Sequence, residues 1–121
     1  MRRTLALFSL AFLTIGSAVP LEAHAFLRKA EPGVGSTVKG SPNEITIQFT
    51  EEVEPAFSKI QVFNAEGKEV DKGDGQVDPS DQTRLAVSLP SLAPGTYKVV
   101  WRVVSVDTHV TNGKFTFTVS R

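Results

Sequence analysis

Apolar and polar residues alternate along this chain with a period of two, and this pattern limits the fold more than any other feature. The longest run, residues 95–105, reads GTYKVVWRVVS. Successive side chains of a β-strand point to opposite faces. One face of this run therefore carries Tyr97, Val99, Trp101 and Val103. Valines also recur on the other face, which is typical of a central strand. We expect Trp101 in the core, because large aromatic side chains dominate core packing.

Shorter runs with the same alternation predict further strands. They are residues 44–50, 59–62, 85–89 and 114–119. An extended start at 25–32 joins them, and turns rich in glycine and proline, such as PGVG at 32–35, separate the runs. No later window has a helical period. About seven short antiparallel strands in roughly 100 residues predict an all-β protein, a two-sheet sandwich of immunoglobulin-like shape forming one domain.

The N-terminal residues predict a secretory signal peptide rather than part of this fold. Two arginines, Arg2 and Arg3, precede an apolar run over residues 5–15. A membrane-spanning helix needs about 20 apolar residues, so this run is too short to span and fits a signal peptide. An uncleaved membrane anchor is the alternative. We expect export, and a soluble protein after cleavage.

The position of cleavage decides whether the mature chain keeps both of its histidines. The triplet Ala23-His24-Ala25 matches the small-x-small pattern and favours a cut after Ala25, which removes His24. A cut after Ala23 instead makes His24 the first residue. The pattern alone leaves both positions open and slightly favours the cut after Ala25.

Charge and sulfur content narrow the possible partners. The whole chain has 13 basic and 13 acidic residues, and removing residues 1–23 leaves 11 basic (13 − 2) and 12 acidic (13 − 1). This balance lacks the basic footprint of a nucleic-acid-binding protein. Cysteine is absent and Met1 is the only methionine, so the mature chain has no disulfide and no sulfur ligand for Cu(I).

Asp107 and His109 form the main candidate metal site. They follow the central strand in the segment SVDTHVTNG, 105–113. If the extended conformation continues there, residues two apart share a face, and the carboxylate and the imidazole can bind one ion. An aspartate that only orients a histidine is the ordinary alternative. An N-terminal His24 would add its α-amine and its imidazole, and three nitrogens with one oxygen suit Cu(II).

Three other groups of polar residues are interpreted as structural. The aspartates of DKGDGQVDPSD, 71–81, lack the spacing of a calcium loop and predict a solvated hairpin loop. Glu51, Glu52 and Glu54 are typical of a solvated edge, although one of them could lie beside the metal. Ser105 is too close in sequence to Asp107 and His109 to form a hydrolytic triad with them.

Three segments resemble the CopC family of periplasmic copper-binding proteins. Residues 92–119, LAPGTYKVVWRVVSVDTHVTNGKFTFTV, are similar to its C-terminal signature, in which a Gly-Thr-Tyr strand leads through Trp-Arg to Ser-x-Asp-x-His and then Gly. IQFTEEVE at 47–54 resembles a second marker, an apolar strand that ends in Phe-Thr/Ser-Glu. HAFLRKAEPGVGS at 24–36 resembles the family's mature N-terminus, which a histidine opens.

The resemblance implies a Greek-key β-barrel or sandwich with one high-affinity Cu(II) site. On this sequence the ligands would be the amine and imidazole of His24, the carboxylate of Asp107 and the imidazole of His109. Glu51 matches a family glutamate that lies near the copper without binding it, and Glu52 is its neighbour. The resemblance therefore favours the cut after Ala23, with residues 1–23 as signal peptide and 24–121 as the copper-binding domain.

The resemblance also implies a role. Some family members hold Cu(I) in a methionine-rich loop, but the matching stretch here, roughly 56–82, has no methionine or histidine. We therefore expect one Cu(II) per chain in a monomeric periplasmic protein, not an enzyme, that sequesters copper or passes it to a CopD-type inner-membrane protein.

Two alternatives to this role stay open. One is a copper-brace oxidase whose site resembles that of lytic polysaccharide monooxygenases. A carboxylate ligand argues against it because the carboxylate opposes reduction to Cu(I). The other is a metal-free immunoglobulin-like interaction module.

Overall fold

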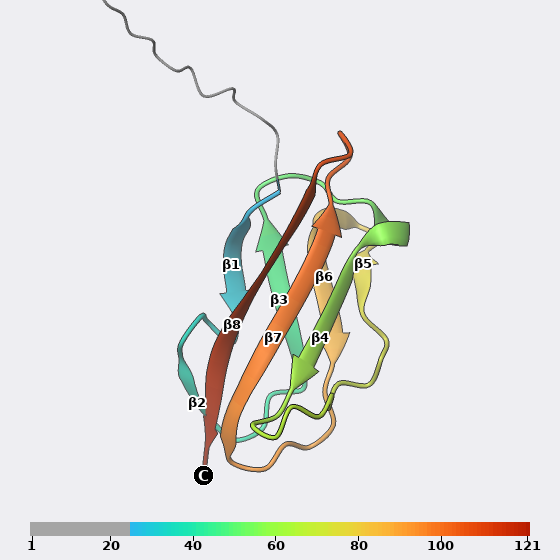
Figure 1. The fold of residues 1–121 in the computed structure, drawn as a ribbon. Coiled ribbons are helices and arrows are strands. Elements are labelled where there is room, and N and C mark those ends of the chain that lie inside the picture. The colour runs from blue at the N-terminus through green and yellow to red at the C-terminus, as the bar shows by residue number, and fades with distance from the viewer. Residues whose placement is uncertain (1–24) are drawn as a thin grey trace, which may run out of the picture.

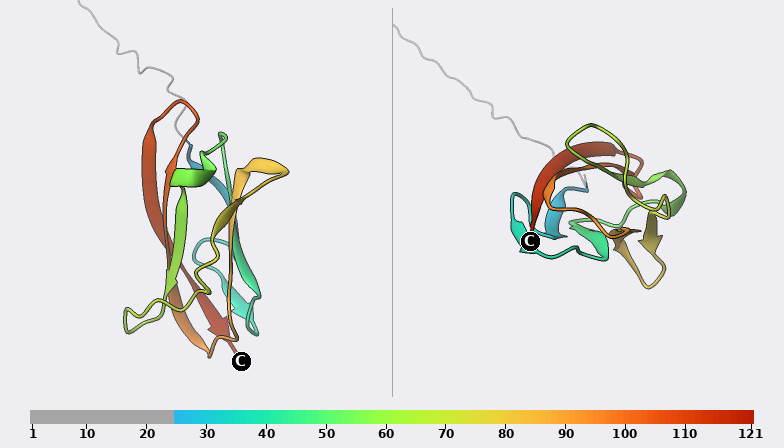
Figure 2. Two further views of the ribbon diagram at one scale, coloured as in Figure 1. Left: turned by 90° about the vertical axis from the view of Figure 1, so that its right-hand side faces the viewer. Right: turned by 90° about the horizontal axis from the view of Figure 1, so that it is seen from below.

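Two four-stranded sheets packed face to face make up the part of the chain that the computed structural model describes, residues 25–121 (Figures 1 and 2). The first, here the β3 sheet, has the order β1 (Leu27–Glu31), β3 (Glu44–Phe49), β6 (Asp81–Ser88) and β5 (Gln76–Asp78). The second, the β7 sheet, has the order β2 (Thr37–Lys39), β8 (Val110–Ser120), β7 (Gly95–Val104) and β4 (Lys59–Phe63). A short 3₁₀ helix, η1 (Pro55–Phe57), precedes β4. Across residues 25–121, no helix has the length and apolar character needed to span a membrane.

The predicted all-β sandwich is confirmed, with one difference in its strands. Eight strands form instead of about seven, and the two that the alternation did not reveal, β2 and β5, have three residues each. Both lie at sheet edges. β2 pairs with β8 in parallel, whereas all other strand pairs are antiparallel, as predicted. A three-residue strand is too short to carry a recognisable period, so sequence patterning could not find it.

The central position predicted for residues 95–105 is also confirmed. β7 lies between β8 and β4, and its alternate residues, Trp101 among them, are buried. The Trp101 ring contacts Phe49 of the facing sheet edge-on, with 5.1 Å between ring centroids. Tyr97 stacks on Phe117, and its hydroxyl donates a 2.6 Å hydrogen bond to the carbonyl of Ala93. Such aromatic pairs contribute about 1 kcal/mol each beyond the area they bury.

The Trp101 ring requires glycine at position 113, because the ring leaves no room there for a side chain. A Cβ at position 113 would lie 2.6 Å from a carbon of that ring, closer than real contacts allow. We expect Gly113→Ala to lower the free energy of unfolding by about 1–3 kcal/mol, because the ring must shift in a packed core. Urea denaturation measures this change. Gly33→Ala is the matched control, since its new Cβ meets nothing closer than 3.8 Å. Equal losses in the two variants would contradict the assignment.

The aspartates of residues 71–81 hold the chain's own backbone, in agreement with a structural loop. Oδ2 of Asp71 accepts a 2.8 Å hydrogen bond from the Val62 N–H, and Oδ1 of Asp74 accepts one of 2.8 Å from the Ser88 N–H. Asp78 accepts hydrogen bonds from both the N–H and the hydroxyl of Ser80. These bonds lower the pKa of Asp74 and of Asp78, because each favours the charged carboxylate.

Candidate metal centre

A tight turn between β7 and β8 carries the two predicted metal ligands that lie within the described residues. The Thr108 N–H donates a 2.8 Å hydrogen bond to the Ser105 carbonyl, and the Ser105 N–H donates one of 2.9 Å to the His109 carbonyl. Thr108 has φ +74°, a left-handed conformation that completes three-residue hairpin loops. The expectation that the extended strand continues to position 109 is therefore wrong, because β7 ends at Val104.

Asp107 and His109 nevertheless meet, as predicted. Nδ1 of His109 lies 3.2 Å from Oδ1 of Asp107. The turn brings the side chains together, whereas strand alternation had been the predicted cause. Both side chains are partly exposed, 38% for Asp107 and 46% for His109, so an ion can reach them from solvent. Two donors at adjacent positions on one metal, each about 2.1 Å from it, lie roughly 3 Å apart. The observed separation fits that arrangement.

A hydrogen bond from Ser105 holds the Asp107 carboxylate in place. Its side chain is buried, with 1% exposed, and its hydroxyl donates a hydrogen bond to Oδ1 of Asp107. The same hydroxyl oxygen accepts a 3.3 Å hydrogen bond from the His109 N–H. The Ser105 hydrogen bond, followed by the contact with His109, lowers the pKa of Asp107 below its usual 3.8. The carboxylate is therefore ionised, and able to bind a cation, at neutral pH. Sequence reasoning considered Ser105 only as a nucleophile and missed this role, although its spacing from Asp107 was visible.

Ser105→Ala is expected to raise the pKa of Asp107 in the metal-free protein, because the strongest bond to the charged form is lost. A depressed pKa stabilises the folded state above pH 3.8, and that contribution disappears as pH falls through the folded value. In Ser105→Ala this contribution should be smaller, and its loss should be complete at a higher pH. Carboxyl NMR titration measures the pKa directly. Ser36→Ala, which removes a hydroxyl bonded to the Gly33 carbonyl, is the control. An unchanged Asp107 pKa in Ser105→Ala would contradict the assignment.

The loop after β3 is fastened to this hairpin. Val53 and Ser105 form a β-bridge, the Val106 N–H donates a 3.2 Å hydrogen bond to the Glu52 carbonyl, and the Glu54 N–H donates one of 2.7 Å to the Val104 carbonyl. These backbone contacts place the predicted acidic cluster, residues 51–54, beside the Asp107–His109 turn.

The start of the described chain reaches the same end of the sandwich. The Phe26 N–H donates a 3.0 Å hydrogen bond to the Thr50 hydroxyl, and the Thr50 N–H donates one of 2.9 Å to the Phe26 carbonyl. Ala25 is fully buried. In Figure 1 the beginning of β1, the loop after β3 and the β7–β8 turn lie together at the upper end. The backbone one and two residues before the first strand is thus anchored next to the loop that contacts the candidate site.

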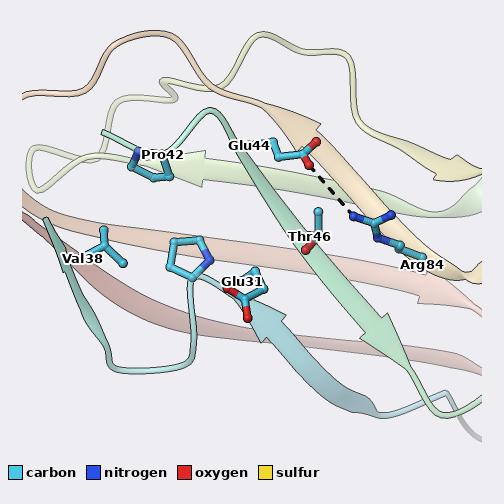
Figure 3. Close-up of a pocket in the computed structure, with 7 residues that line it drawn as sticks. Glu31, Val38, Pro42, Glu44, Thr46 and Arg84 are labelled. Carbon is cyan, nitrogen blue, oxygen red and sulfur yellow. Dashed lines mark ion pairs between the residues drawn. The ribbon is translucent and has the colours of Figure 1, made fainter. Parts of the chain in front are cut away.

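The predicted ligand set is only partly within the described residues. His24 and the signal peptide, residues 1–23, lie outside them. Glu51 is half-buried in the fastened loop. Within residues 25–121, no group of three or more histidine, aspartate or glutamate side chains is arranged to hold a metal. Asp107 and His109 therefore form an incomplete site on their own. A surface pocket drawn in Figure 3, lined by Glu31, Thr46 and Arg84 among others, contains none of the predicted ligands.

Comparison with known proteins decides the family. Residues 27–120 match the CopC domain. The chain belongs to the CopC family. This CopC-family chain is similar to protein YobA of Escherichia coli K12, with 39% identity over 114 residues that cover 93% of this chain and 92% of YobA.

Two solved structures extend the CopC relationship to three dimensions. CopC from Methylosinus trichosporium OB3b has a TM-score of 0.72 and 37% identity, covering 80% of this chain and 94% of that one. PcoC from Escherichia coli, described as a methionine-rich copper resistance protein, has a TM-score of 0.70 and 31% identity, covering 81% and 100%. The predicted CopC resemblance is confirmed. The description of PcoC as a copper resistance protein agrees with the prediction that this chain is not an enzyme.

Proposed function

We propose that this protein binds one Cu(II) ion through the α-amine and imidazole of His24, the carboxylate of Asp107 and the imidazole of His109. The observation that carries the proposal is the 3.2 Å separation of the Asp107 and His109 donor atoms. That pair lies at the end of the sandwich to which Phe26, two residues after His24, is hydrogen-bonded. Two extended residues span at most about 7 Å, a length that would allow His24 to reach that end.

The donor set favours Cu(II) over Cu(I). Imidazole, amine and carboxylate are the ligands of tetragonal Cu(II) sites, whereas Cu(I) favours thiolate and thioether sulfur. This chain has no cysteine, and Met1 is its only methionine. In this respect it differs from PcoC, which is described as methionine-rich. One Cu(II) site and no Cu(I) site follows from the donors that the chain offers.

The proposed role is that of a monomeric copper carrier in the periplasm. The signal peptide proposed for residues 1–23 supports export, and membership of the CopC family supports a copper-related role. A protein that holds Cu(II) without chemistry on a substrate either sequesters the ion, which gives tolerance, or hands it to a CopD-type inner-membrane protein. Glu51, beside the Asp107–His109 turn, is proposed to lie near the bound copper without binding it.

Titration of the exported protein with Cu(II) against a competing chelator tests the proposal. The intact mass is measured first and is expected to correspond to a chain that begins at His24. Stoichiometric retention of one Cu(II) per chain is then expected. Affinity should increase from acid toward neutral pH and above, because the ligands must lose protons to bind and an α-amine has a pKa of about 8. Failure to retain Cu(II) against the chelator would overturn the proposal.

A further inference from the structure

The strands of the β7 sheet carry positive charge only. β2, β4, β7 and β8 contain no aspartate or glutamate, and they hold five exposed cations: Lys39, Lys59, Lys98, Arg102 and Lys114. Along these strands the buried residues alternate with exposed ones, so the cations project from the outer face of the sheet. Residues 25–121 contain 11 basic and 12 acidic side chains, so five of the 11 cations gather on one face of a chain with almost no net charge.

Three of these cations, Lys59, Arg102 and Lys114, lie close to one another, and among the described residues none of the five has a partner of opposite charge. Lys59 and Arg102 are directly opposite in the β4–β7 register. Lys114 faces Val100, the outward residue two positions before Arg102. Within residues 25–121 none of the five forms an ion pair, and Lys98 lies instead 5.9 Å from the centroid of the Phe63 ring. Like charges directly opposite on a sheet are unfavourable, so an external anion would stabilise this arrangement.

The opposite face of the sandwich has mixed charge. The strands of the β3 sheet carry Glu31, Glu44, Asp78 and Asp81 together with three cations. Arg84 of β6 lies 3.4 Å from Asp78 and 4.0 Å from Glu44. Figure 3 shows the Glu44 and Arg84 side chains pointing toward each other across neighbouring strands. The charge of the β3 sheet is thus largely neutralised within the protein, whereas the charge of the β7 sheet is not.

The outer face of the β7 sheet matches a lipid surface better than a protein surface. The core of a protein–protein interface is depleted of charge and rich in aromatic residues. Between its cations this face carries short polar side chains, such as Asn112 and Thr116, together with a few apolar ones, such as Phe63 and Val100. The cations are spread over all four strands. An open depression of about 510 Å³, lined by Lys59, Arg102 and Lys114 together with Val100 and Trp101, has room for a phosphate group. We propose that this face binds the anionic surface of a phospholipid bilayer.

Binding of the β7 sheet to a bilayer would also orient the metal centre. The β7–β8 turn with Asp107 and His109 is at one end of the same sheet (Figure 1). With the sheet against headgroups, that end lies at the rim of the contact and stays open to solvent and to proteins embedded in the bilayer. The proposal goes beyond copper binding and does not depend on it.

Co-sedimentation of the mature protein with vesicles tests the proposal. The vesicles contain phosphatidylglycerol and phosphatidylcholine in equal parts, and pure phosphatidylcholine vesicles serve for comparison. Binding to the anionic vesicles only is expected, and it should weaken at high salt. Each cation near such a surface contributes roughly fivefold to binding, so reversal of two, Lys59→Glu with Lys114→Glu, should weaken binding by about 30-fold or more.

The matched control reverses two cations elsewhere. Lys29→Glu with Lys72→Glu gives the same net charge, but Lys29 is on β1 and Lys72 is in the loop before β5. The vesicle affinity of this control should stay within a few-fold of that of the unaltered protein.

Equal losses of vesicle binding in the two variants would mean that net charge alone acts and would overturn the proposal. Absence of binding by the unaltered protein would overturn it too, and would leave an acidic protein as the partner to consider. Thermal unfolding of each metal-free variant, which should be unchanged, verifies folding. If Lys59→Glu with Lys114→Glu unfolds, Lys59→Gln with Lys114→Gln repeats the test.

Discussion

A chain that begins at Phe26 is expected to bind Cu(II) on the order of 10⁴-fold more weakly than a chain that begins at His24. Four-ligand metal sites in small domains are worth about 10–16 kcal/mol, or roughly 3 kcal/mol per ligand. Loss of the amine and the imidazole of His24 removes two ligands, and about 6 kcal/mol corresponds to a factor of 10⁴. Both chains keep Phe26, Asp107 and His109, and the shorter chain also lacks Ala25, which is fully buried. The measurement is competition for Cu(II) against a chelator of known affinity.

A third chain, with one glycine added ahead of His24, distinguishes the contribution of the His24 imidazole to Cu(II) affinity from that of the α-amine. It keeps the imidazole but moves the α-amine away, so its affinity should fall by about 100-fold, between the other two. Thermal unfolding of the three metal-free chains shows whether the fold is the same. Equal Cu(II) affinity in the chains that begin at His24 and at Phe26 would exclude His24 as a ligand. It would also remove the reason to prefer cleavage after Ala23.

The strands show where sequence patterning is sufficient. β7 and β8 span 10 and 11 residues, so several periods of alternation are visible and the prediction held. β2 has three residues, and its place depends on parallel pairing with the end of β8, between Thr37 and Thr118 among others. That pairing is a tertiary contact and leaves no local pattern. The same is true of the contact between Gly113 and Trp101, which lie opposite each other on neighbouring strands.

The meeting of Asp107 and His109 was predictable from the sequence, but the geometry that brings them together was not. Sequence placed Asp107 and His109 together through the period of a strand, whereas a turn with Thr108 in the left-handed region brings them together. A threonine in that conformation costs about 1–3 kcal/mol, so propensity gave no sign of the turn. The role of Ser105 was not predicted because it depends on a buried hydrogen bond from its hydroxyl to the Asp107 carboxylate, which the sequence does not reveal. The attachment of residues 51–54 to the hairpin is a contact between distant segments, and only the three-dimensional structure reveals it.

Replacement of His109 by alanine is expected to lower Cu(II) affinity by about 100-fold, through the loss of one imidazole worth roughly 3 kcal/mol. The side chain is 46% exposed, so its removal should change the free energy of unfolding little. Asn112→Ala, an exposed substitution in β8 near the same turn, is the control and should keep full affinity.

Electron paramagnetic resonance adds a readout that a purely structural role of His109 would not change. The Cu(II) spectrum of His109→Ala should show one fewer nitrogen ligand. Asp107→Asn should weaken binding too, while leaving the number of nitrogens unchanged. If His109→Ala kept both the affinity and the nitrogen pattern, the ion would be bound elsewhere, and the Asp107–His109 contact would serve only to hold the hairpin.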